Sequence, residues 1–244
     1  MVIAGLVVLV GVNFVPMISL KTPGMDEYSV NGITTYAIPA HQQAAGDIAE
    51  RVAASQERVL QAMGDIDSSG IDVIVYPNRN ALKRKTLGLA GMLILPDWFI
   101  GRNTRNTVLI ASPEAPGPEH TYESVVRAAV HEYVHVLTYR LNRKLDYWLL
   151  EGLAVYLAEQ MPSDTAVREA ASRITFEQFS QTNAIQFANV GGYALAYTLI
   201  AYLEAAYGWD HVMALAEPDA TYQSVLNTSK RELFDAWRTS IQGE

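Results

Sequence analysis

The chain contains 244 residues, with 18 Lys or Arg against 26 Asp or Glu, so its formal net charge is −8. This acidic balance argues against a nucleic-acid-binding protein, because such a protein needs a basic face to neutralise phosphates. Half of the residues are hydrophobic and 18% are charged, which is typical of a folded protein with a substantial core. There is no cysteine, so disulfides, a Cys nucleophile and thiolate metal sites are excluded. Any metal would have to be bound by His and carboxylates.

An uncharged, mainly apolar run spans residues 2–20. Its length is close to the ~20 residues that cross a bilayer as a helix. No basic residue precedes the run and no Ala-x-Ala cleavage site follows it, so an uncleaved transmembrane anchor is favoured over a removed signal peptide. Asn13 and Pro16 weaken such a span, and a segment buried at the edge of the domain is the alternative. Residues 1–24 are therefore interpreted as an anchor or signal segment with a linker.

Predicted strands and helices alternate over about residues 30–118. Short β-rich runs predict strands at Ile33–Ile38, Ile71–Tyr76, Met92–Leu95 and Thr107–Ala111. Apolar residues at helical spacing predict helices over His41–Met63 and Ala81–Leu87. Polar, Gly-containing composition predicts a linker at Thr22–Glu27 and a turn at Gly101–Asn106.

From Thr121 onward the pattern becomes almost wholly helical, with helices predicted over Tyr122–Leu141, Tyr147–Gln160, Tyr193–Tyr207 and Lys230–Ile241. The sequence therefore predicts an α+β fold, in which a small mixed N-terminal sheet with a flanking helix precedes a mostly helical half at about residues 119–244. A single domain over residues 25–244 is expected, with the active site in a cleft between these two parts.

The sharpest motif is H-E-Y-V-H at residues 131–135, inside a predicted helix. Residues four apart on a helix lie on one face, one turn apart, so His131 and His135 can bind the same Zn²⁺. Glu132 lies beside that face, where its carboxylate can reach a water on the metal without binding the metal itself. This arrangement is typical of a general base beside an activated water.

A catalytic zinc site needs a third protein ligand. The candidate is Glu151, within the apolar segment W-L-L-E-G-L-A-V-Y-L at residues 148–157. A carboxylate buried in such a helix requires a cationic partner, which a metal would supply. The polar stretch Leu141–Asp146 has the length of a turn between the two helices. The alternative interpretation is a structural His pair and a Glu paired with Arg or Lys.

Together these two segments resemble the gluzincin metallopeptidases, and most of all the peptidase MA-like domains, in which H-E-x-x-H is followed by W-x-x-E-G-x-A. Weaker likeness extends over most of residues 33–241. The resemblance implies a zincin-like fold that binds one Zn²⁺ per chain, with Glu132 as the catalytic acid/base and with the metal ligands His131, His135 and Glu151.

The activity that the resemblance implies is hydrolysis of peptide or protein substrates. Tyr193 is the candidate donor to the oxyanion, since family members often have a Tyr at the head of the corresponding helix. No G-x-M-x-N sequence is present, which aminopeptidase N-like enzymes use to grip a free N-terminus, so an endopeptidase is favoured. The predicted strand Thr107–Ala111 precedes the metal helix, and we expect an extended substrate to pair with it.

Two other functions stay open. The protein is alternatively a catalytically weak binding module that retains the zincin fold, or a zinc hydrolase that acts on a bond other than a peptide. The presence of Glu132 argues against the first, because a degenerate site is expected to lose its general base. The run at residues 2–20 adds the expectation of membrane attachment, in an anchored or exported protein whose catalytic domain is extracytoplasmic.

Overall fold

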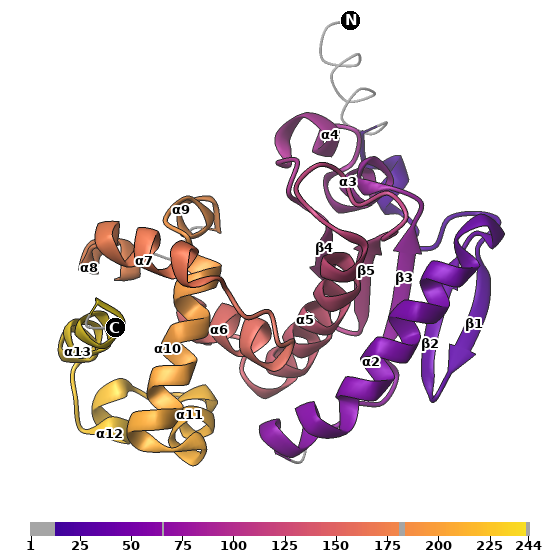
Figure 1. The fold of residues 1–244 in the computed structure, drawn as a ribbon. Coiled ribbons are helices and arrows are strands. Elements are labelled where there is room, and N and C mark those ends of the chain that lie inside the picture. Colours follow the sequence, from indigo (N-terminus) through magenta and orange to yellow (C-terminus); the bar gives the residue numbers. More distant parts are fainter. Residues whose placement is uncertain (1–12, 65, 181–183, 243–244) are drawn as a thin grey trace, which may run out of the picture. The chain divides into compact units, whose positions relative to one another are not determined.

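The structure is a computed structural model that describes residues 13–64, 66–180 and 184–242 (Figure 1). The chain divides into two compact units, which we call the sheet unit (residues 1–57 and 68–136) and the helical unit (residues 58–67 and 137–244). The predicted α+β class is confirmed, because a small five-stranded sheet precedes a series of helices. The division falls within two long helices, α2 (Gln42–Met63) and α5 (Tyr122–Leu141).

The sheet has the strand order β1-β2-β3-β5-β4. These strands are β1 (Asp26–Val30), β2 (Ile33–Ala37), β3 (Asp72–Tyr76), β4 (Gly101–Asn103) and β5 (Thr107–Ala111). The three central strands are parallel, whereas β1 and β4 pair antiparallel at the two edges. Asn31 and Gly32 have φ values of 49° and 84°, the positive values that a tight hairpin between β1 and β2 requires. β1 begins at Asp26, so the last two residues of the predicted linker Thr22–Glu27 belong to a strand.

Strands β3 and β5 are buried on both faces, whereas β2 alternates buried and partly exposed residues. On one face, Ile74, Tyr76 and Leu109 pack against Leu82 of α3 (Arg79–Leu87). Figure 1 draws α2 and α5 in front of the strands. These two helices are held together by polar contacts along their length: Arg51 to Glu123 at 2.8 Å, and Gln56 to Tyr133 at 3.2 Å. The part of α5 up to Val136, which carries the whole metal motif, is thus held within the sheet unit.

Two predicted elements of this unit were wrong. Met92–Leu95 is not a strand, because Gly91–Ile94 forms the short helix α4, on which Leu93 and Ile94 are exposed. Gly101–Asn106 is not only a turn, since its first three residues form β4 and pair with β5. This pairing places β5 in the interior of the sheet, so β5 has no unpaired edge for a substrate. The expectation that substrate pairs with Thr107–Ala111 is therefore wrong.

The predicted transmembrane helix is not supported. Among the described residues, no helix is long and apolar enough to cross a membrane. Most of the apolar run, residues 2–12, lies outside the described residues. In its later part, residues 13 and 14 are helical and are followed by the 3₁₀ helix η1 (Val15–Met17). Pro16 lies at the start of η1, and the side chain of Asn13 hydrogen-bonds to the chain after α3.

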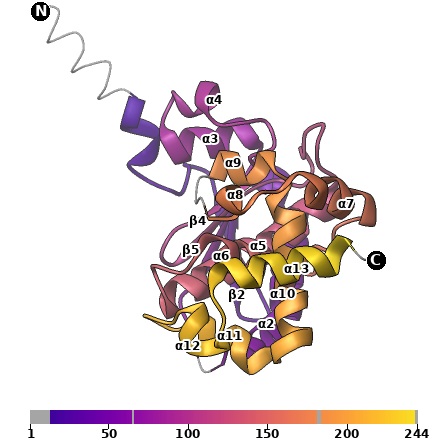
Figure 2. The ribbon, with the colours of Figure 1, turned by 90° about the vertical axis from the view of Figure 1, so that its left-hand side faces the viewer.

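The helical unit contains eight helices among its described residues. They are α6 (Tyr147–Leu157), α7 (Asp164–Arg173), α8 (Phe176–Ser180), α9 (Ala184–Asn189), α10 (Gly192–Tyr207), α11 (Trp209–Ala216), α12 (Tyr222–Leu226) and α13 (Lys230–Gln242). α10 packs against α6, α7, α11 and α13, and Figure 2 shows α13 crossing α10. The four helices predicted after residue 120 are confirmed, including α5, although α6 ends before Gln160.

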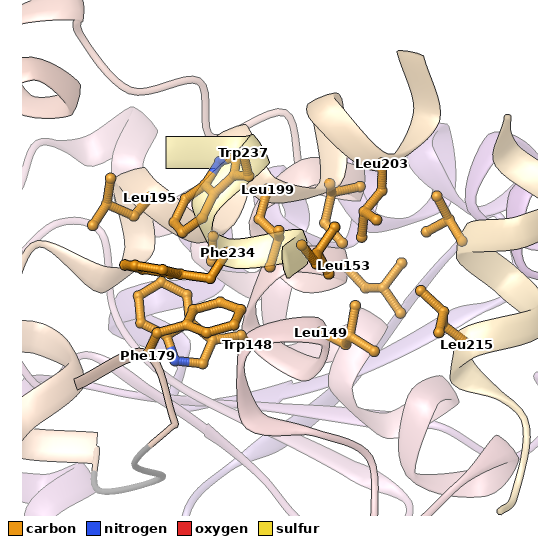
Figure 3. Close-up of a cluster of buried hydrophobic side chains, with 14 of the residues drawn as sticks. Trp148, Leu149, Leu153, Phe179, Leu195, Leu199, Leu203, Leu215, Phe234 and Trp237 are labelled. Carbon is orange, nitrogen blue, oxygen red and sulfur yellow. The ribbon is translucent and has the colours of Figure 1, made fainter. Parts of the chain in front are cut away.

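The core of the helical unit is an aromatic and leucine cluster. Trp148, Phe179, Phe234 and Trp237 gather at one end, beside leucines of α6 and α10 (Figure 3). The ring centroid of Phe179 lies 5.1 to 5.6 Å from the ring centroids of the other three residues, within the usual range for aromatic packing. Trp148 belongs to the same helix as Glu151, so this core fixes the helix that carries the candidate third ligand.

Candidate metal centre

The two histidines of the motif lie on one face of α5, whose bounds match the predicted helix. Their ring centroids are 4.5 Å apart and the ring planes are nearly perpendicular, at 89°. Both side chains are buried, with 8% of each residue exposed. The remaining residues of the motif, Tyr133 and Val134, are fully buried and anchor the opposite side of the helix. The i, i+4 spacing therefore produces the geometry that it predicted.

Glu132 lies against Gly101 of the edge strand β4. The space that Glu132 occupies there is open only because glycine has no side chain. A Cβ atom built on Gly101 would lie 2.8 Å from Oε1 and 3.0 Å from Cγ of Glu132, and 3.1 Å from Cδ1 of Ile110. Glu132 as a whole residue is 9% exposed. The absence of a side chain at Gly101 thus makes room for the candidate general base beside the edge of the sheet.

Glu151 is presented by α6, which begins with a well-formed cap. The Asp146 carboxylate accepts a hydrogen bond from Trp148 N at 3.0 Å and lies 2.5 Å from Nζ of Lys230. Such a cap satisfies a backbone donor at the helix start. Glu151 is 6% exposed. The prediction that this helix is buried is confirmed, because α6 is buried along most of its length.

Gly152, the residue after Glu151, allows close contact between α6 and α10. A Cβ at this position would lie 2.7 Å from Cγ1 of Ile200 and 3.0 Å from the backbone oxygen of Ala196. The E-G pair of the second motif thus combines a candidate ligand with a helix-packing residue. Packing against α10 leaves α6 little freedom to rotate and move Glu151.

The three candidate ligands come together. One ligand atom from each of His131, His135 and Glu151 lies within 4.8 Å of the others, and all three residues are buried. Two imidazoles and one carboxylate are the protein donors of a class of catalytic zinc sites, which leave one position open. Both donor types bind zinc at ~2.0–2.2 Å in such sites. The residues present therefore fit the metal that the motif implies.

Tyr193, the predicted oxyanion donor, lies in the first turn of α10 and is half-buried. Its ring packs edge-on against Phe187, with centroids 5.1 Å apart and planes at 90°. This contact holds the ring on the core of the helical unit. Because α10 packs against α6, Tyr193 and Glu151 lie on neighbouring helices. Its catalytic role stays a prediction.

Of the other histidines, His41 and His120 lie at hydrogen-bond distance from other residues of the fold, and His211 is exposed. Nδ1 of His41 lies 2.9 Å from Oγ of Ser112, and Nε2 of His120 lies 2.9 Å from the backbone oxygen of Trp98. His211 is exposed on α11. None of these three belongs to the metal cluster found among the described residues.

The sequence interpretation missed Gly101 as a residue of the site. Glycine in a Gly-Arg-Asn segment is a normal turn signal, and nothing in the sequence places it beside a glutamate 31 positions later. The position of β4 beside Glu132 becomes visible only once β4 and β5 are paired.

Comparisons with known proteins add no family assignment. No protein-family model matches the chain, and a search of curated proteins finds no match.

Proposed function

We propose that this protein is a zinc-dependent peptidase with a zincin-like fold, of the gluzincin type, and that it acts as an endopeptidase. The observation that carries the proposal is the buried cluster of His131, His135 and Glu151, with its ligand atoms within 4.8 Å of one another. Glu132, next to one ligand in the chain, supplies the acid/base that hydrolysis needs. The H-E-x-x-H and W-x-x-E-G-x-A patterns support the same assignment.

The chemistry follows from these residues. When bound, Zn²⁺ lowers the pKa of a water molecule to about 7 and polarises a carbonyl group. Glu132 accepts the proton of the attacking water and then delivers it to the leaving amine. Its packing against Gly101 restricts where the carboxylate can lie, which favours a defined approach of the water. Tyr193 is proposed to donate a hydrogen bond to the developing oxyanion.

The substrate is proposed to pair with β4 in place of β5. β4 forms the end of the sheet, and among the described residues no strand pairs with its outer side. An extended peptide can add to such an edge through backbone hydrogen bonds. Because Gly101 of β4 lies against Glu132, a peptide on this edge would run past the proposed general base.

The test is peptide hydrolysis by wild type and by Glu132→Gln, with zinc content measured on the same samples. We expect the substitution to lower the rate of casein hydrolysis by about 10²–10⁴-fold while zinc stays bound. Glu50→Gln is the matched control, because Glu50 is exposed on α2. Full activity of Glu132→Gln would refute the mechanism. Zinc binding by a wild type that cleaves no peptide would instead favour a binding module or a different hydrolase.

A further inference from the structure

The sheet unit carries a concentrated group of exposed apolar side chains. They come from two segments, and we call them the apolar patch. Phe14, Val15 and Ile18 are 50%, 58% and 83% exposed. The second segment contributes Leu87, Leu89, Met92, Leu93 and Ile94, of which Leu93 is 90% and Ile94 65% exposed. The other large hydrophobic side chains that are exposed in the described chain lie scattered, at Tyr122, Tyr139, Met161 and Ile185.

The two segments of the patch are joined by specific contacts. Asn13 accepts a hydrogen bond from Ala90 N at 2.8 Å through its side chain, and another from Leu89 N at 3.2 Å through its backbone oxygen. Gly88 makes this approach possible, since a Cβ there would lie 2.1 Å from the Asn13 oxygen. Nζ of Lys85 also donates to the backbone oxygen of Ser19, at 2.6 Å. η1, α3 and α4 thus form one local structure, which Figure 1 shows beside the start of the described chain.

Positive charge is concentrated around the same segments. Residues 13–21 and 79–105 contain seven of the 18 basic residues but only one of the 26 acidic residues, Asp97. Their net charge is +6, whereas the rest of the chain carries −14. Asp97 is already paired with Lys83, at 3.1 Å. Of these basic residues, Arg84 is exposed on α3, whereas Lys83 is buried and Arg105 lies in the turn between β4 and β5, at the other end of the sheet. An exposed apolar patch in a net basic part of an acidic protein favours an anionic partner for that patch.

We propose that the apolar patch docks on the surface of a bilayer that contains anionic lipids, without crossing it. Apolar side chains that enter the headgroup and acyl boundary, beside Lys and Arg that face lipid phosphates, are the recognised features of interfacial membrane binding. Residues 2–12, which precede the patch in the chain, contain no charged residue. The chain thus continues from the patch into a sequence compatible with the same surface. This inference concerns a different surface from the metal cluster and does not depend on it.

The test is flotation of the full chain with vesicles of phosphatidylcholine, with or without phosphatidylserine. Wild type is expected to float with the anionic vesicles, and to bind less to pure phosphatidylcholine or at about 0.5 M salt, where charges are screened. Leu93→Asp combined with Ile94→Asp should weaken binding at least about tenfold. Arg84→Glu should weaken it at least about fivefold. Both changes are on exposed positions, so the fold should be retained, as thermal denaturation can verify.

The matched control is Met161→Asp combined with Ile185→Asp, because these side chains are also exposed, at 75% and 62%, but belong to the helical unit. This control should float like wild type. The proposal is overturned if wild type does not float, or if the Leu93 and Ile94 variant floats as well as the control. It is also overturned if light scattering shows a dimer that the same variant disperses, since a second copy would then cover the patch.

Discussion

Replacing Gly101 with Ala tests whether the edge of the sheet positions Glu132. The added methyl carbon would lie 2.8 Å from Oε1 and 3.0 Å from Cγ of Glu132, well inside ordinary van der Waals contact. The end of a glutamate is flexible, whereas Ile110 on the other side, at 3.1 Å, belongs to a fully buried strand position. The carboxylate is therefore the group that moves, by roughly 0.5–1 Å, because carbon contacts are normally about 3.5 Å or longer.

A displacement of this size at a general base lowers catalysis by up to about 10²-fold. We expect kcat/KM for peptide hydrolysis to fall about 10- to 100-fold, while zinc content is unchanged and stability falls by no more than about 1–3 kcal/mol. Gly46→Ala is the matched control, because Gly46 is helical and a Cβ there meets nothing within 4 Å. That change should leave activity intact. Wild-type activity in Gly101→Ala would refute the argument that this contact positions Glu132.

Two further substitutions probe the helical unit. Gly152→Ala should destabilise the protein by about 1–3 kcal/mol in urea denaturation, because its Cβ would lie 2.7 Å from Ile200 Cγ1 and 3.0 Å from the Ala196 oxygen. An unchanged urea midpoint of unfolding would show that α6 and α10 separate easily. Tyr193→Phe should lower kcat about 10²-fold with stability nearly unchanged, since the ring keeps its contact with Phe187. Equal kcat for Tyr193→Phe would remove its assignment as the oxyanion donor.

The sequence correctly predicted long helices with a sustained helical periodicity and strands that are almost fully buried. The bounds of α5 and β5 agree with the prediction, because an apolar stripe at helical spacing and a β-branched run each have one stable arrangement. β4 was missed, since three residues of turn-like composition become a strand only through pairing with β5. Met92–Leu95 was misassigned because an apolar run was interpreted as a buried strand, whereas most of its side chains lie on the surface.

The candidate site was predictable to the extent that it depends on local geometry. The spacing of His131 and His135 on one helix determines that their rings meet. The proximity of Glu151 follows from tertiary structure, so the sequence supported it only through the apolar character of its helix and the family resemblance. The contact of Gly101 with Glu132 carries no sequence signal, because it joins a strand and a helix that are distant in the chain.

The measurement that tests the central claim most directly is the zinc content of the purified protein, determined by elemental analysis. Wild type and His135→Ala are compared, with His211→Ala as a control, because His211 is exposed and lies outside the cluster. We predict about one zinc per chain in wild type and in the control, and none in His135→Ala. Absence of zinc from all three proteins after incubation with added metal would contradict the account.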